Sequence, residues 1–233
     1  MKTLEITSYI GCSNRCHYCP QKTLIEAYGN GNREMSMQDF IEILANVPKD
    51  VRIDFSGFSE IFLHPYGADL IRYAYEAGYS IVLYTTLEGF TEEDIKTLRG
   101  VKFAEVCFHQ WPGYKLHDFE RKKEWFRTKI QDGRTAEITK QWLWSRAGNV
   151  FAMEHRQGRF KCLFADRDFN HNVVLPNGNV YLCCQDYGLK HRIGNLFETN
   201  FDLMNRNHIR NLSTENDSYC ICRNCELAQY ETT

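Results

Sequence analysis

Short apolar runs alternate with amphipathic stretches along the first two thirds of the chain. The runs that predict strands, from their β-branched and aromatic residues, are residues 3–8, 51–55, 80–85, 103–108 and 136–142. The stretches that predict helices are residues 37–44, 68–77, 92–98 and 118–130. Because strands that alternate with helices build parallel sheets, the pattern predicts an α/β fold made of βα units.

Capping residues support two of the predicted helices. Ser36 and Thr91 each precede a helical stretch and are followed three residues later by Asp39 and Asp94, which is the spacing of a capping box. Gly78 follows the stretch 68–77, where a glycine commonly ends a helix. These signals define where the predicted helices begin and end.

The pattern changes after about Gly148. Residues 172–175 and 179–182 alternate like two strands, and the Asn177-Gly178 dipeptide between them is typical of a β-hairpin turn. A short helix at residues 203–211 and a cysteine-rich tail follow. We therefore divide the chain into residues 1–155 and 156–233. The second part is too small to bury much core, and a bound metal cluster would add the missing stability.

Composition and charge narrow the function classes. The chain has 233 residues, of which 43% are hydrophobic and 25% are charged, and its net charge is −2. This composition is that of a soluble globular protein, and the scattered basic residues argue against a nucleic-acid partner. The sequence shows no secretory signal and no apolar run long enough for a membrane span, so we expect a cytoplasmic protein without a membrane partner.

Ten cysteines are unusual for such a chain and indicate metal binding, because disulfides are rare in reducing compartments. Cys107 stands alone. The other nine form two groups, which are Cys12, Cys16 and Cys19 near the start, and Cys162, Cys183, Cys184, Cys220, Cys222 and Cys225 near the end.

The first group lies in the loop after the first predicted strand, at the edge where parallel sheets place their ligand sites. A [4Fe–4S] cluster normally takes four thiolates, so three leave one iron open, as catalytic metal sites do. The C-x-x-x-C-x-x-C spacing, with Tyr18 before the last cysteine, resembles the signature of the radical S-adenosylmethionine (AdoMet) enzymes. The resemblance implies a partial (β/α) barrel whose open iron binds AdoMet and cleaves it to a 5′-deoxyadenosyl radical. It also implies a reductant such as flavodoxin or ferredoxin.

Two further segments resemble cofactor-binding stretches of that family. Gly57, Ser59 and Glu60 follow the second strand, where the family binds the amino group of AdoMet. Thr85 and Thr86 follow the third strand, where the family contacts the ribose or the carboxylate. The alternative is that Glu60 and Thr85 only cap the loops that follow them.

The second cysteine group resembles the opening of the SPASM domain and of its short version, twitch. Fifteen residues separate Cys162 from Gly178, and four more separate Gly178 from Cys183. The resemblance implies a small hairpin-plus-helix domain with a second, auxiliary [4Fe–4S] cluster held by Cys162, Cys183, Cys222 and Cys225. Cys184 or Cys220 can replace the neighbouring ligand, and a structural zinc site remains an alternative.

The resemblance extends to short twitch dehydrogenases, and it implies a radical AdoMet oxidoreductase. Its substrate would be a small sugar-like or cyclitol-like molecule, oxidised by two electrons with the auxiliary cluster as electron acceptor. Arg146, His109 and Cys107 are the candidate catalytic residues. Three alternatives remain, which are an epimerase with Cys107 or Cys184 as hydrogen-atom donor, a peptide-modifying enzyme, and a zinc-binding interaction protein that makes no radical.

Overall fold

The computed structural model describes residues 2–14, 16, 18–110, 116–137, 145–163, 171–204 and 220–230. Its elements, in chain order, are β1 (Thr3–Ile6), α1 (Gln21–Tyr28), α2 (Met37–Ala45), β2 (Arg52–Phe55), η1 (Ile61–Leu63), α3 (Gly67–Glu76), β3 (Ile81–Thr85), α4 (Glu92–Leu98), β4 (Glu105–Gln110), α5 (Leu116–Lys129), β5 (Arg134–Glu137), β6 (Phe160–Cys162), β7 (His171–Val174), β8 (Asn179–Tyr181), β9 (Arg192–Asn195), η4 (Phe201–Leu203), η5 (Ile221–Asn224) and β10 (Ala228–Tyr230).

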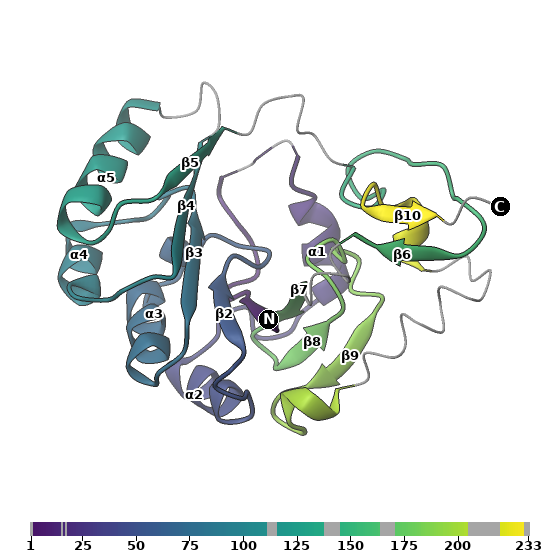
Figure 1. Cartoon of the computed structure of the whole chain (residues 1–233), viewed down its shortest axis with the longest axis horizontal. Helices are drawn as coiled ribbons and strands as arrows, with labels where there is room; N and C mark the ends of the chain where they lie inside the picture. Colours follow the sequence, from purple (N-terminus) through teal and green to yellow (C-terminus); the bar gives the residue numbers. More distant parts are fainter. Residues whose placement is uncertain are drawn as a thin grey trace.

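Eight of these strands form one sheet in the order β5-β4-β3-β2-β1-β7-β8-β9. The pairs from β5 to β7 are parallel, and the β7–β8 and β8–β9 pairs are antiparallel. Figure 1 shows α2 to α5 on one side of the sheet and the β7–β9 meander continuing it beyond β1. The predicted α/β class with a mainly parallel sheet is confirmed.

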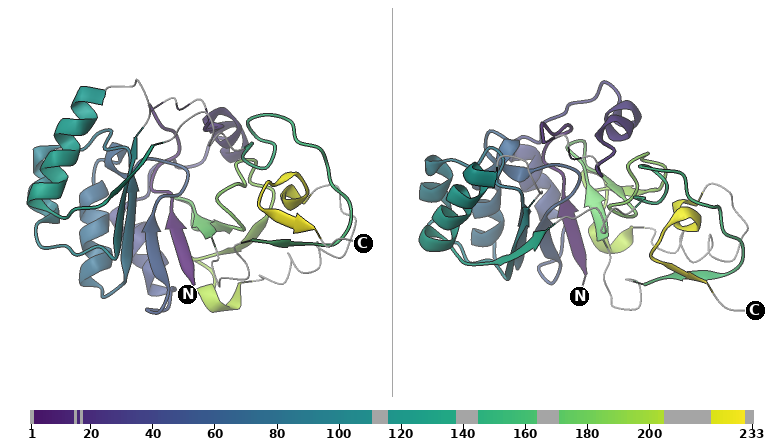
Figure 2. Two further views of the ribbon diagram at one scale, coloured as in Figure 1. Left: turned by 45° about the horizontal axis from the view of Figure 1, so that its top comes forward. Right: turned by 90° about the horizontal axis from the view of Figure 1, so that it is seen from above.

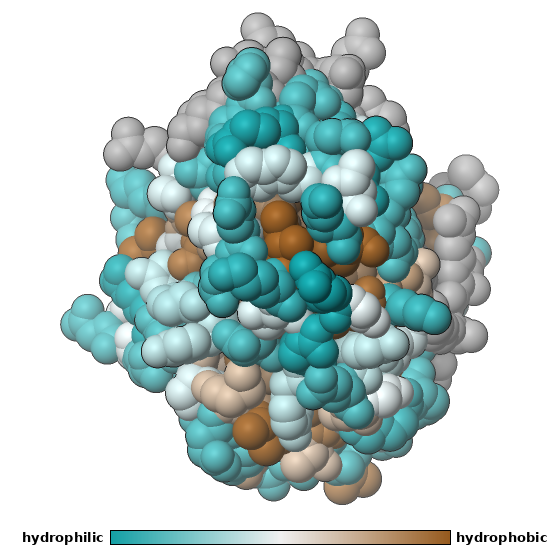
Figure 3. Space-filling view, turned by 90° about the vertical axis from the view of Figure 1, so that its left-hand side faces the viewer, coloured by the Kyte–Doolittle hydropathy of each residue, from teal (hydrophilic) through white to brown (hydrophobic). Residues whose placement is uncertain are grey.

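The two faces of the parallel strands differ in chemistry because side chains alternate along a strand. Leu4, Ile53 and Leu83 pack with the helices in the large hydrophobic core. Their strand neighbours Glu5 and Asp54 are buried on the opposite face, which is therefore polar. The outer, helix-covered side is mostly hydrophilic toward solvent, with hydrophobic groups set among polar ones (Figure 3).

The predicted helix signals are confirmed. In α2 the Ser36 hydroxyl accepts from the Asp39 N–H, and the Asp39 carboxylate accepts from the Ser36 N–H. Thr91 and Asp94 form the same capping box in α4. Gly78, just past α3, has a φ of 85°, the left-handed conformation that favours glycine.

The predicted strand boundaries shift by one or two residues at several strands, and β1, for example, ends at Ile6 and not at residue 8. β4 runs from Glu105 to Gln110, and β5 already begins at Arg134, so both differ by two residues from the predicted starts. Residues 138–142 of the expected fifth strand, and residues 205–211 of the expected short helix, lie outside the described residues. The sequence pattern did not predict α1, β6, β9 or β10.

The predicted hairpin is confirmed, but it does not stand apart from the first sheet. β7 pairs in parallel with β1, with Leu4 opposite Asn172, so the hairpin extends the sheet. Gly178 closes the turn at a φ of 74°, and a Cβ atom there would lie 2.5 Å from the Phe197 ring. A separate two-stranded sheet of β6 and β10 lies beside the meander (Figure 2). No described helix has the length and apolar character to cross a bilayer.

Candidate functional site

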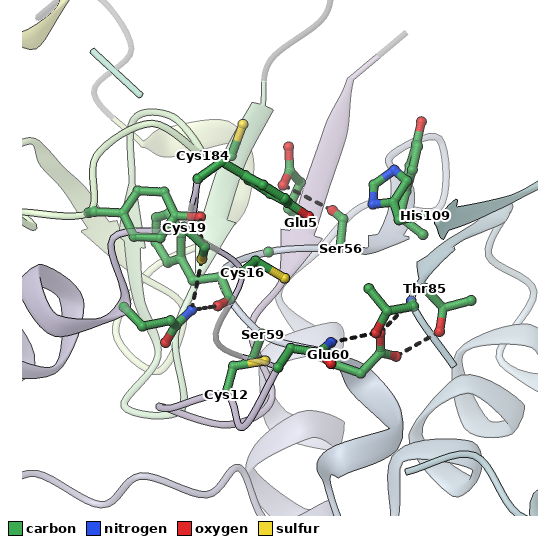
Figure 4. A pocket seen from close by; sticks show the side chains of 18 of the residues that line it. Glu5, Cys12, Cys16, Cys19, Ser56, Ser59, Glu60, Thr85, His109 and Cys184 are labelled. Carbon is green, nitrogen blue, oxygen red and sulfur yellow. Dashed lines mark hydrogen bonds between the residues drawn. The ribbon is translucent and has the colours of Figure 1, made fainter. Parts of the chain in front are cut away.

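A cavity of about 290 Å³ opens where the parallel strands end. The cysteine loop that follows β1 forms one side of it, and Cys12, Cys16 and Cys19 all line it. Figure 4 shows these three residues on one side of the cavity, with Thr85 and His109 on the other. The structure thus brings the first cysteine group to the carboxyl ends of the strands, as the sequence predicts.

Hydrogen bonds hold the cysteine loop in place. The Cys19 N–H donates to the Cys16 carbonyl (3.0 Å), which forms a tight turn between these two residues. The Gln21 amide donates to the Cys19 sulfur (3.4 Å), and the Tyr187 hydroxyl lies 3.5 Å from the same sulfur. The Asn14 amide donates to the Thr86 hydroxyl (2.6 Å), so the loop is also tied to the end of β3.

The three thiols fit a metal cluster. The pKa of Cys12 is raised to about 11 and that of Cys16 to about 12, chiefly by burial, and neighbouring cysteines contribute to both shifts. Thiols that raise one another's pKa form a site that favours a bound cation over three thiolates alone. Among the described residues, no three Cys, His, Asp or Glu side chains lie close enough together to hold a single metal ion. A four-iron cluster is larger than a single ion, so its ligands lie further apart.

Gly57 allows the end of β2 to pass close to β1. Its φ is 41°, and a Cβ atom there would lie 2.3 Å from the Thr7 hydroxyl oxygen and 2.6 Å from the Ile6 carbonyl oxygen. Beside it, Ser59 also lines the cavity, and its buried hydroxyl has no hydrogen-bond partner among the described residues. Because a buried polar group is costly without a partner, this hydroxyl suits a polar ligand in the cavity.

Glu60 connects the ends of β2 and β3. One carboxylate oxygen accepts from the Thr85 hydroxyl (2.7 Å) and from the Phe62 N–H (3.4 Å). The other accepts from the Thr86 N–H (2.6 Å) and the Thr86 hydroxyl (2.7 Å). A carboxylate has about four acceptor positions, and these four bonds use them. Glu60 therefore organises this edge of the cavity. This is the loop-capping role that the sequence left open as an alternative to cofactor binding.

We expect Glu60→Gln to lower the free energy of unfolding by about 2 kcal/mol, because a neutral amide cannot accept all of these hydrogen bonds. Urea denaturation monitored by circular dichroism measures this change. Glu26→Gln on the exposed face of α1 is the matched control and should change the value by less than about 0.5 kcal/mol. Equal effects of the two substitutions would contradict the role of Glu60.

Arg146 lines the cavity between the two cysteine groups. Burial alone lowers its pKa, but Tyr187, Cys184 and Cys19 nearby more than offset this effect, so the net pKa is raised. Its guanidinium also lies 5.7 Å from the centre of the Tyr18 ring, within reach of a cation–π contact. Arg146 and Ala147 both have positive φ values, 55° and 52°, so the segment turns sharply at this point.

His109 and Cys107 lie on the same face of β4 but at different depths. His109 lines the cavity, and its ring lies 5.7 Å from the Tyr84 ring, centre to centre, at a tilt of 45°. Cys107 is fully buried, and it is absent from the described residues that line the cavity. Burial is the main cause that raises the pKa of the Cys107 thiol. The catalytic roles of Arg146, His109 and Cys107 stay predictions.

The pKa of His109 is lowered to about 4, chiefly by burial and further by Arg134 and Arg146. The ordinary value is 6.5, so between these two values the unfolded chain binds a proton that the folded chain does not. Stability therefore falls as the pH drops from about 6.5 to 4. We expect His109→Gln to reduce this loss by roughly 2 kcal/mol, measured by urea denaturation at pH 6.5 and 4.5. An unchanged pH dependence would contradict the lowered pKa.

The sequence interpretation missed several residues that line the cavity. Glu5 on β1 lines it and accepts from the Ser56 hydroxyl (2.9 Å). Asp54 on β2 lines it too and is paired with Arg52 through two contacts of 2.6 Å. Polar residues at every second position of a buried strand were the available signal, because they indicate a polar inner face.

Part of the second cysteine group assembles around the β6–β10 pair. Cys162 lies opposite Ala228 in this pair, and Cys222 and Cys225 pack against the small hydrophobic cluster beneath it. The pKa of Cys225 is raised to about 11, chiefly by burial, and Cys162 is among the groups that contribute to this shift. Cys183 instead packs against the large core, whereas Cys184 lines the cavity.

Comparisons with known proteins support the fold and the second cysteine group. The chain has the fold of the radical AdoMet enzymes, and residues 162–226 match the SPASM iron–sulfur cluster-binding domain. This match confirms the predicted kind of cofactor for the second group. No curated protein sequence matches the chain significantly.

Solved structures with this fold include two with bound AdoMet and one with a bound precursor peptide. BtrN in complex with AdoMet and 2-DOIA is 19% identical, with a TM-score of 0.66 over 87% of this chain and 80% of that one. The enzyme anSMEcpe with bound AdoMet is 16% identical, with a TM-score of 0.62 over 96% and 83%. Streptococcus suis SuiB bound to the precursor peptide SuiA is 12% identical, with a TM-score of 0.53 over 97% and 69%. The predicted resemblance is thus confirmed for the fold.

Proposed function

We propose that this protein is a radical AdoMet enzyme that removes a hydrogen atom from a small polyhydroxylated molecule and oxidises it by two electrons. The observation that supports the proposal most is that one cavity is lined by the three thiols of the first group, by the Glu60 and Thr86 edge, and by Arg146. These residues come from segments far apart in the sequence. Candidate cluster ligands, a polar edge for the cofactor and the positively charged side chain of Arg146 therefore line the same cavity.

In this proposal, Cys12, Cys16 and Cys19 hold a [4Fe–4S] cluster that, with AdoMet bound, supplies a 5′-deoxyadenosyl radical. The Ser59 hydroxyl and the edge that Glu60 organises bind the polar groups of AdoMet. The bond from Asn14 to Thr86 keeps this edge next to the cysteine loop. The buried side chains of Phe58 and Tyr187 line the same space and limit access of water to it.

The polar face of the sheet supports a hydroxyl-bearing substrate. Glu5 and Ser56 offer acceptors, and neutral His109 offers a ring nitrogen that can accept a hydrogen bond or a proton. Arg146 can donate to a substrate oxygen.

The second cysteine group supplies, in this proposal, a cluster that accepts the second electron. The SPASM match to residues 162–226 supports a cluster there. The segment 145–149, which carries Arg146, contacts the tail through the hydrogen bond from the Ser145 N–H to the Glu226 carboxylate. In this proposal, the cluster that accepts the electron therefore lies next to residues that line the cavity.

The test is an anaerobic assay of the reconstituted protein with AdoMet, dithionite and a panel of cyclitols and amino sugars. We expect release of 5′-deoxyadenosine and a product two mass units lighter than its substrate. A product of unchanged mass that gains one deuterium in deuterated water would instead support the epimerase alternative. No cleavage of AdoMet by the iron-loaded protein would rule out the proposed function.

A further inference from the structure

The Cys19 sulfur has two hydrogen-bond partners that lie outside the cysteine loop. The Gln21 amide at the start of α1 lies 3.4 Å from this sulfur, and the Tyr187 hydroxyl lies 3.5 Å from it. Tyr187 is 168 residues further along the chain, in the loop after β8. By contrast, Cys16 is hydrogen-bonded by the Tyr18 hydroxyl, which belongs to the cysteine loop itself. The second part of the chain therefore contacts one thiol of the first group directly.

The direction of these two hydrogen bonds follows from the chemistry of a metal ligand. A metal-bound thiolate carries no proton, so both neighbours must donate to it. The Tyr187 hydroxyl can turn its hydrogen toward the sulfur. The Gln21 Nε2 atom faces two acceptors, the Cys19 sulfur and the Phe58 carbonyl, and the reverse orientation would place the amide oxygen against both. Cys19 therefore accepts two hydrogen bonds when it ligates metal.

Packing holds the Tyr187 ring in place independently of its hydroxyl. The residue is 3% exposed, and the centre of its ring lies 4.6 Å from that of the Phe58 ring. The Phe58 N–H donates to the Thr7 hydroxyl (2.9 Å), which fixes this neighbour beside the end of β1. Leu24 of α1 and Val173 of β7 belong to the same hydrophobic cluster. Loss of the hydroxyl alone is therefore a small change to the packing.

The backbone around Tyr187 is also held by hydrogen bonds. The Tyr187 N–H donates to the Gln185 carbonyl (2.9 Å), and the Asn149 amide donates to the same carbonyl (3.0 Å). The Asp186 N–H donates to the Cys183 carbonyl (2.9 Å), which forms a turn directly after β8. The Tyr187 hydroxyl is therefore presented to Cys19 from a fixed position.

We propose that Tyr187 and Gln21 are positioning residues that make the first cluster easier to reduce. This inference rests on the proposed function, in which Cys19 is a ligand of that cluster. A hydrogen bond withdraws negative charge from a ligand sulfur, so it stabilises the reduced form of a cluster, which holds one more electron, more than the oxidised form. That electron comes from the one-electron reductant, such as flavodoxin or ferredoxin. Through Tyr187, the second part of the chain thus acts on the step that forms the radical.

Tyr187→Phe tests the proposal, because it removes the hydroxyl and keeps the ring against Phe58. The measurement is a redox titration of the anaerobically reconstituted full chain, followed by the electron paramagnetic resonance signal that changes when AdoMet is added. At the midpoint potential of the parent, we expect the ratio of reduced to oxidised first cluster to fall at least threefold, which corresponds to a midpoint about 28 mV lower. Gln21→Met removes the amide donor at similar length and should also lower the midpoint. Iron content should stay within a tenth of that of the parent in both variants.

Tyr28→Phe is the matched control. Tyr28 packs against the same hydrophobic cluster, but its hydroxyl donates to the Asn32 carbonyl and not to a thiol, so its loss should leave the midpoint unchanged. The parent's midpoint in Tyr187→Phe or in Gln21→Met would overturn the proposal, as would an equal shift in Tyr28→Phe. Loss of iron in Tyr187→Phe would overturn it too, because the hydroxyl would then be needed to hold the cluster. A parent without a signal that responds to AdoMet would instead overturn the proposed function.

Discussion

Replacing Cys16 with alanine is expected to lower 5′-deoxyadenosine release at least about a thousandfold, to the background rate without enzyme. Cys16 lines the cavity with Cys12 and Cys19, and these three thiols are the proposed ligands of the first cluster. With only two thiolates left, the loop can ligate two of the four irons. The proposed cluster needs three ligated irons and a fourth that binds AdoMet. Chromatography of the anaerobic reaction with dithionite measures the released nucleoside.

The control for this prediction is Lys22→Ala, one turn beyond the cysteine loop. The Lys22 side chain is 90% exposed and pairs only loosely with Glu26, at 3.8 Å. Its loss should leave the rate within twofold of the parent, because exposed ion pairs contribute little. Iron content of the Cys16→Ala protein should fall by about half, since the second cysteine group is intact. Cleavage at the parent rate in Cys16→Ala would exclude this thiol as a cluster ligand.

The fold could be predicted where local signals determine it. The capping boxes of α2 and α4 lie within four residues of sequence, and both form as predicted. α1 was missed because it has one fully buried residue, Leu24, and begins after Pro20 without a side-chain cap. Strands β6 and β10 have three residues each, and their pairing joins segments more than sixty residues apart. Such pairing depends on tertiary contacts that no local pattern encodes.

The same distinction applies to the candidate site. The cysteine motif and the residues at strand ends identified one side of the cavity, because parallel strands place their carboxyl ends at one edge. The pairing of β7 with β1 was not predicted, yet it carries Cys184 and Tyr187 toward Cys19. Glu60 was identified as a site residue, but its contacts with Thr85 and Thr86 became apparent only from the structure.

Replacing Cys222 with alanine is expected to separate AdoMet cleavage from product formation. Cys222 lies in η5, among Cys162 and Cys225, on the tail side of the molecule and not in the wall of the first cluster site. The first cluster should therefore still release 5′-deoxyadenosine, at more than about a tenth of the parent rate. The oxidised product should fall at least about a hundredfold, because the proposed electron acceptor is missing.

The ratio of product to 5′-deoxyadenosine measures this separation directly, and it does not depend on how much protein is active. Arg223→Lys is a useful comparison, since Arg223 is fully buried beside Cys222 and donates to the Gly158 carbonyl (2.8 Å). This change loosens the tail without removing a thiol, so it should lower stability while the ratio stays near that of the parent. A parent-like ratio in Cys222→Ala would show that oxidation does not need this thiol, and it would favour a reaction in which the substrate radical recovers a hydrogen atom.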